Sequence, residues 1–252
     1  MPESRKRIHM LDEIRGFAIL CMIVHHSFLD VGDVLELSWG YTVFDKLCIV
    51  QPFFWAAFIV ISGMCSRLSR NTAKRGIIVL ICAGIITFVT SVIMPLFGFV
   101  GAEIYFGILH CLGICMIVTG ILMPIIKKVN YKIGAAVCAV LFLLTYEIEN
   151  HYILFKLVEL PDSWYQFNFL APFGLHNDLF YSADYFPIFP WIFMFLFGAF
   201  IGKFAVEENL PEVMYQQRSK FLSLVGRNSL WVYLAHQPII YAVMMFISLF
   251  RQ

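Results

Sequence analysis

Long apolar runs separated by short polar stretches dominate the chain. Each run extends over about 20 residues, the length that an α-helix needs to cross the hydrocarbon core of a membrane. The runs do not alternate with a period of two, as the strands of a membrane barrel do. The pattern predicts transmembrane helices at approximately 14–30, 48–66, 77–97, 104–126, 133–149, 186–205 and 228–249. We therefore expect an all-α, polytopic membrane helix bundle with about seven transmembrane helices, forming a single domain over residues 1–252.

Composition supports a membrane protein. The 252 residues are 60% hydrophobic and 14% charged, whereas a soluble domain carries about 25% charged residues. The net charge of +1 gives no indication of a nucleic-acid partner. The seven cysteines lie mostly inside apolar runs and form no CxxC pair, so they are expected to be small packing residues rather than disulfides or metal ligands.

Basic residues predict the orientation. Lys and Arg concentrate on the cytoplasmic side of membrane proteins. With the N-terminus in the cytoplasm, fifteen of the 18 Lys and Arg residues fall on the inner side, and the C-terminus lies outside. The first apolar run is expected to be a retained span rather than a signal peptide, because no small-residue cleavage site follows it. The aromatic-rich stretch 150–185 is expected to pack over the helix ends.

Histidines inside the predicted spans are candidates for chemistry, since ionisable groups in lipid are costly. His26 and His110 lie roughly 6–9 Å below the outer surface by helical rise, so they are expected to line one site. Asp30 follows His26 by four residues, on the same helical face, where it is expected to orient the imidazole. His236 lies nearer the inner side, at a different predicted depth. The alternative is that these histidines are buried and merely join helices by hydrogen bonds.

Basic and polar residues at the inner side are candidates for phosphate binding. The alternative is the ordinary basic bias of cytoplasmic loops. Arg15 and His26 lie about 16 Å apart along one helix, so a long phosphorylated carrier could bind at the inner end and react near the histidines. Asp184 precedes a predicted helix, where it either caps that helix or serves the site. The predicted phosphate ligands are Arg15, Arg70, Asn71, Arg75, Arg227 and Asn228.

Several motifs resemble one family. RIHMLDEIRG (7–16) with His26 resembles the opening of the transmembrane acyltransferase superfamily. The chain as a whole is similar to the bacterial branch of the heparan-α-glucosaminide N-acetyltransferase catalytic-domain family. The motifs that carry this resemblance are ISGMCSRLSRN (61–71), FGILHCLGI (106–114), DYFPIFPWIFMFLFGAFIG (184–202) and GRNSLWVYLAHQP (226–238).

The resemblance implies an acyl-CoA-dependent acetyltransferase of the plasma membrane. Cytoplasmic acetyl-CoA would be the co-substrate, without a metal, and an amine or hydroxyl of an extracytoplasmic sugar or glycan the acceptor. His26 would match the essential histidine, His110 and Asp184 would stand beside it, and Asp30 would replace an acidic residue that relatives carry where this chain has His25. His236 would belong to the donor site, together with the phosphate ligands named above. Membrane lipids are expected partners, and relatives indicate a homodimer.

Other functions remain open from the residues alone. A proton-coupled transporter or flippase could use the histidines as a relay, although no inverted repeat is present. A haem-binding electron carrier could use paired histidines on facing helices. A structural membrane scaffold explains neither the basic motifs nor the ordered histidines.

Overall fold

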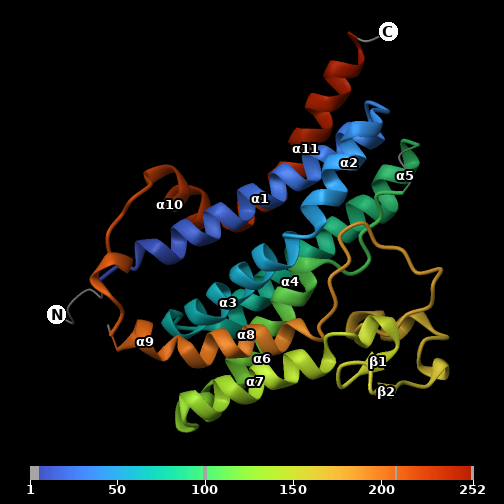
Figure 1. Cartoon of the computed structure of the whole chain (residues 1–252). Helices are drawn as coiled ribbons and strands as arrows, with labels where there is room; N and C mark the ends of the chain where they lie inside the picture. The colour runs from blue at the N-terminus through green and yellow to red at the C-terminus, as the bar shows by residue number, and fades with distance from the viewer. Residues whose placement is uncertain (1–5, 99–100, 208, 251–252) are drawn as a thin grey trace. The chain divides into compact units, whose positions relative to one another are not determined.

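The computed structural model describes residues 6–98, 101–207 and 209–250. Helices dominate it (Figure 1), and within the described part of the chain the strands are limited to one two-stranded hairpin. The predicted all-α class is confirmed.

Five helical segments are long and apolar enough to cross a membrane. Two of them combine shorter elements: the segment Thr72–Leu96 consists of α4 (Thr72–Phe88), the π-helix η1 (Val89–Ile93) and α5 (Met94–Leu96). The segment Tyr131–Asn150 consists of α7 (Tyr131–Thr145) and the 3-10 turn η2 (Ile148–Asn150). The other three are α1 (His9–Asp33), α6 (Ile108–Lys128) and α11 (Ser229–Ser248).

A bent pair of helices provides a sixth candidate span. The helices α2 (Ser38–Cys48) and α3 (Gln51–Leu68) meet at an angle of 55°. The remaining apolar segment, α8 (Trp191–Ile201) with α9 (Lys203–Val206), is shorter. These findings establish an integral membrane helix bundle, whereas the count of seven spans and the inward N-terminus stay predictions.

The chain folds into two compact units. The first joins Met1–Ile61 to Glu208–Gln252, and the second comprises Ser62–Glu207. The first unit is thus built from both ends of the chain. It contains α1, α2, the beginning of α3, η5 (Glu212–Met214), α10 (Lys220–Arg227) and α11.

In the first unit, α10 and α11 follow α1 in the same direction (Figure 1). A constant separation of 210 residues relates Glu13 to Ser223 and His26 to His236. Two glycines in the same register allow the close approach. A Cβ atom on Gly226 would lie 1.8 Å from the carbonyl oxygen of Asp12, and one on Gly16 would lie 2.2 Å from that of Leu222. The absence of side chains at these two positions lets the backbones touch.

The second unit packs α6 against α4 and α8, and α7 against α8. Its centre combines small residues with large aromatic ones such as Phe195, which is fully buried. One buried cluster joins α6, α7 and α8 through Ile126, Ala135, Cys138, Ala199 and Phe200.

The stretch between α7 and α8 has a small core of its own. Its elements are β1 (Tyr152–Ile153), β2 (Val158–Glu159) and the 3-10 turns η3 (Asp162–Trp164) and η4 (Asn168–Phe173). The strands pair antiparallel. Ile148, Leu160, Tyr165 and Leu175 form the buried cluster, and the Tyr165 hydroxyl donates to the carbonyl of Ile148.

Candidate functional site

A pair of histidines marks the centre of the first unit. His26 on α1 and His236 on α11 face each other, with Nδ1 of His26 3.1 Å from Nε2 of His236. His236 is buried. The prediction that His236 lies at a different depth from His26 is therefore wrong.

The error came from the predicted ends of the spans. Hydropathy placed the beginnings of the first and last spans at 14 and 228, as if these positions were level. In the structure α1 begins at His9, and Gly16 rather than the helix start lies beside Gly226. Ten further residues along α1, and ten along α10 and α11, then bring His26 level with His236.

The hydrogen bonds of the pair determine its tautomers. Nδ1 of His236 contacts the backbone carbonyl of Tyr233, which can only accept, so Nδ1 carries a proton. In the neutral ring Nε2 of His236 is then an acceptor, and His26 must donate to it from Nδ1. This arrangement leaves the lone pair of His26 on Nε2, where a general base needs it.

Asp30 contacts Gln237, which was not among the predicted site residues. Its two carboxylate oxygens accept hydrogen bonds from Nε2 of Gln237, at 3.1 and 3.0 Å. The expected direct pairing with His26 is replaced by this contact, because His26 turns its Nδ1 to His236. The position of Gln237 directly after His236 in the HQP motif was the available signal.

Gln237 also presents a polar atom without a partner. A carboxylate accepts but cannot donate, so the contact with Asp30 fixes which end of the amide is nitrogen. The opposite atom, Oε1, is buried and has no hydrogen-bond partner among the described residues. The Gln237 side chain lies beside His26 as well. An unsatisfied buried acceptor next to a base is a place where a ligand N–H or O–H would bind favourably.

His25, which precedes the base, is turned to other partners. Its Nε2 lies 3.5 Å from Sγ of Cys48, and its Nδ1 lies 3.4 Å from Nε2 of Gln51. The ring packs against Phe44, with 4.2 Å between centroids. His25 therefore ties α1 to the break between α2 and α3, and the side chain that orients His26 is His236 instead.

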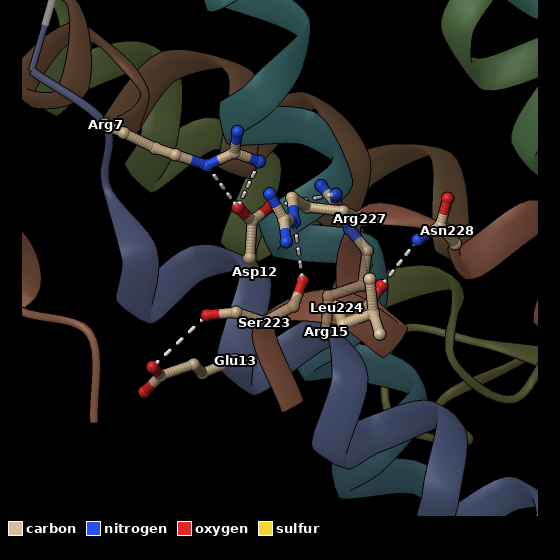
Figure 2. A network of polar contacts seen from close by, with 8 residues as sticks. All are labelled: Arg7, Asp12, Glu13, Arg15, Ser223, Leu224, Arg227 and Asn228. Atoms are coloured by element: carbon tan, nitrogen blue, oxygen red, sulfur yellow. Dashed lines mark hydrogen bonds and ion pairs between the residues drawn. The ribbon is translucent and has the colours of Figure 1, made fainter. Parts of the chain in front are cut away.

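A cluster of arginines lies nearer the beginning of α1 (Figure 2). Asp12 accepts from Arg7 at 3.0 and 2.7 Å and faces Arg15 at 3.9 Å. The Arg15 side chain is only 13% exposed. Within the described part of the chain this distant ion pair is its only polar contact, so most of its five N–H donors remain for a ligand.

Two of the other predicted phosphate ligands of this unit serve the backbone. Arg227 donates from Nε to the carbonyl of Ser223 at 3.3 Å, and Asn228 donates to the carbonyl of Leu224 at 2.9 Å (Figure 2). The start of α10 is also occupied. The buried carboxylate of Glu13 accepts from the backbone N–H groups of Arg218 and Ser219, at 2.8 and 2.9 Å. The start of α10 is therefore taken by Glu13, and a phosphate there would meet a carboxylate instead of free N–H groups.

The second unit contains His110 and Asp184, and both hold the beginning of α6. Nδ1 of His110 accepts from the backbone N–H of Gly107 at 3.2 Å, and its Nε2 lies 3.3 Å from the hydroxyl of Thr87. Asp184 accepts from the backbone N–H of Ile108 at 3.3 Å. The capping function considered for Asp184 is therefore present, but it serves α6 and not the helix that follows Asp184. The role of His110 in catalysis stays a prediction, since both ring nitrogens have partners.

In the basic segment before α4, some side chains bind backbone groups and others are exposed to solvent. Asn71 accepts from the backbone N–H of Lys74 at 2.9 Å and caps α4. Arg67, which was not among the predicted ligands, donates to the carbonyl of Phe200 at 3.2 Å at the end of α8. Arg70 and Arg75 are exposed.

The predicted site residues are thus divided between the units. His26, Asp30 and His236 gather in the first unit, which also contains Arg15 and the start of α11. The second contains His110 and Asp184, with the segment 70–75. The expectation that His26 and His110 line one site stays a prediction. Among the described residues no group of three or more His, Cys, Asp and Glu side chains is arranged to hold a metal ion.

Comparison with known proteins gives one match. The sequence profile described as "Heparan-alpha-glucosaminide N-acetyltransferase, catalytic" matches residues 7–238. No curated protein and no solved structure matches the chain significantly. The match extends from the arginine cluster at the beginning of α1 to the proline after Gln237, and so includes all the residues described above. The chain belongs to the heparan-α-glucosaminide N-acetyltransferase catalytic-domain family and is a membrane protein of the acetyltransferase type.

Proposed function

We propose that this protein transfers an acetyl group from cytoplasmic acetyl-CoA to an amine of an extracytoplasmic sugar or glycan, in the plasma membrane. The observation that carries the proposal is the His26–His236 pair, because its hydrogen bonds leave a basic nitrogen on His26 inside a membrane helix. Family membership supplies the type of reaction.

Arg15 supports a phosphorylated donor. Its mostly buried guanidinium has one ion pair at 3.9 Å, and Arg7 and Arg227 lie near it (Figure 2). Arginine donors of this kind suit phosphate oxygens. Eleven residues of α1 separate Arg15 from His26, about 16 Å along the axis. A donor whose phosphates bind at Arg15 can therefore extend its thioester along α1 towards the histidines.

The acceptor side favours an amine over a hydroxyl. Two acceptors lie together there: the lone pair on Nε2 of His26 and the unpartnered Oε1 of Gln237. A primary amine has two N–H groups and can donate to both, whereas a hydroxyl has one O–H and leaves the other acceptor unsatisfied. An unsatisfied buried acceptor costs about 1–3 kcal/mol, which is enough to discriminate between the two.

In the proposed reaction the amine nitrogen attacks the thioester carbonyl while His26 Nε2 removes one proton. The C–S bond then breaks, and His26 returns the proton to the CoA sulfur. During the step His26 is positively charged, and its Nδ1–H remains directed at His236, which orients the ring. General-base catalysis of this kind contributes roughly 10²–10⁴-fold.

The first experiment is binding of acetyl-CoA to detergent-purified protein, beside free CoA and a His26→Ala variant. We expect micromolar binding to both proteins and slow loss of the thioester in the wild type alone. Binding without thioester loss in either protein would keep the donor and would point either to a base other than His26 or to a step that needs the acceptor. An absence of binding, in protein shown to be folded, would overturn the proposed function.

A further inference from the structure

The β1–β2 hairpin has an unusual tip. The strands Tyr152–Ile153 and Val158–Glu159 are joined by four residues. Three successive residues of this tip adopt positive φ angles: Leu154 (54°), Phe155 (59°) and Lys156 (68°). Such angles are uncommon for residues other than glycine, and bulky side chains in this conformation are strained. Strained backbone of this kind persists where surrounding contacts maintain it, and it is often found at functional sites.

Hydrogen bonds place the tip beside the end of a candidate membrane span. The backbone N–H of Leu154 donates to the carbonyl of Leu144, in the last turn of α7, at 2.8 Å. Lys156 pairs with Glu147 at 3.6 Å. The tip therefore folds back to the level of the final turn of α7, which belongs to the span Tyr131–Asn150. The end of a span lies at the boundary between lipid and water.

The side chains at the tip are apolar and uncovered. Phe155 is 62% exposed and Leu157 is 82% exposed. In the same stretch Leu160 and Leu175 lie in the small core, whereas Phe167, Phe169 and Leu179 are exposed like the tip. The two tip residues therefore remain outside a core that was available nearby.

We propose that the β1–β2 hairpin inserts its tip, Phe155 and Leu157, into the interface of the lipid bilayer beside α7. The left-handed backbone directs the tip back to the helix end, and lipid covers the two apolar side chains. Lys156 between them can keep its ammonium at the headgroup level while its stem lies along apolar surface.

Charge around the hairpin indicates which lipid property matters. Residues 147–162 carry four carboxylates, on Glu147, Glu149, Glu159 and Asp162, against the single cation of Lys156. A segment with an excess of negative charge is not attracted to anionic headgroups. Insertion is therefore expected to depend on apolar area, and anionic lipid is not expected to increase it.

Photo-crosslinking in lipid nanodiscs tests the proposal. The full chain would carry benzoylphenylalanine in place of Phe155 or Leu157, and, as the matched control, in place of Asp162 of the same stretch, whose side chain is 89% exposed. Nanodiscs of phosphatidylcholine, alone or mixed with phosphatidylglycerol, supply the lipid. We expect at least tenfold more lipid adduct by mass spectrometry at positions 155 and 157 than at 162, with no gain in yield from phosphatidylglycerol. Similar yields at all three positions would overturn the insertion.

A second measurement uses natural side chains, since the photoreactive group is itself apolar. The double variant Phe155→Ser and Leu157→Ser is compared with the wild type by hydrogen–deuterium exchange of the amides of residues 152–160 in nanodiscs. Faster exchange in the variant, with unchanged exchange in α6, supports insertion. Equal exchange of the hairpin in the two proteins contradicts it.

Discussion

At the scale of single residues, the position of protons decides what the histidine pair can do. The carbonyl of Tyr233 determines the proton on His236, and His236 determines that on His26. The sequence indicated His26 from its resemblance and His236 from its motif. It could not reveal the pairing, because hydropathy locates span ends only approximately. It also could not assign a role to Gln237, whose meaning depends on a contact with Asp30 207 residues earlier.

Replacing His236 tests this relay. In His236→Ala the ring of His26 loses the partner that holds its proton on Nδ1, so the tautomer with a basic Nε2 is no longer favoured. We expect kcat of acetyl transfer to fall roughly 10²–10⁴-fold, with KM for acetyl-CoA unchanged. Steady-state kinetics measure both constants, and His151→Ala removes a histidine outside the pair as the control. A rise in KM at constant kcat would place His236 in donor binding instead.

Tyr165 gives a prediction for alkaline pH. Burial, together with the nearby negative charge of Glu149, raises the pKa of Tyr165 from 10.0 to about 12. A raised pKa in the folded state means that its contribution to stability is complete below about pH 10 and is lost as the pH rises towards 12. We expect the stretch between α7 and α8 to lose order in this pH window. Tyrosinate absorbance measures the ionisation, and limited proteolysis measures the loss of order. The variant Tyr165→Phe should weaken this pH dependence, whereas Tyr181→Phe, at an exposed position, should leave it unchanged. Equal behaviour of the two variants would contradict the assignment to Tyr165.

At the scale of elements, the long transmembrane helices were the feature that the sequence predicted best. Long apolar runs gave α1, α4, α6 and α11, because a helix in lipid has few alternatives. The contact of α10 with α1 was missed, since α10 is too short and polar to appear as a span. The hairpin tip was missed because Leu, Phe and Lys carry no sign of a left-handed backbone.

The crossing of α1 and α10 yields a stability prediction. In Gly226→Ala the added methyl group would lie 1.8 Å from the Asp12 carbonyl oxygen, so the two backbones must separate. Overpacking of this kind costs about 1–3 kcal/mol or more. Gly84→Ala is the matched control, because no atom lies within 4 Å of its Cβ position, and alanine favours a helix by up to about 1 kcal/mol. Thermal unfolding in detergent should show a lower Tm for Gly226→Ala and not for Gly84→Ala. Equal Tm values would show that the two backbones separate without loss of stability.

At the scale of the whole molecule, the last uncertain span determines the side on which the chain ends. Trp191–Val206 is a shorter apolar segment than the candidate spans. Its 16 residues would extend about 24 Å as one helix, against a hydrocarbon core of about 30 Å. The distribution of Lys and Arg nevertheless favours seven crossings.

A reporter at the C-terminus measures this directly. With seven crossings and a cytoplasmic N-terminus, we expect a C-terminal phosphatase fusion to be active outside the membrane and a C-terminal fluorescent protein to be dark there. As the control, the same reporters are fused after Lys128, in a loop that is predicted to be cytoplasmic. There the phosphatase should be inactive and the fluorescent protein bright. A cytoplasmic C-terminus would mean that the number of crossings is even, so that either Trp191–Val206 or the bent pair α2–α3 does not cross.

The first unit can close only after α11 has been made, because its two halves lie far apart along the chain. His26 leaves the ribosome 210 residues before His236, and at roughly 5–20 residues per second this delay is roughly 10–40 s. During that interval α1 carries Glu13, His26 and Asp30 while the helices that will satisfy them are still to be made. Nascent chains stalled before α11 are therefore expected to depend on the insertion machinery to shelter α1. The protein would acquire its oriented base only once α11 has joined α1.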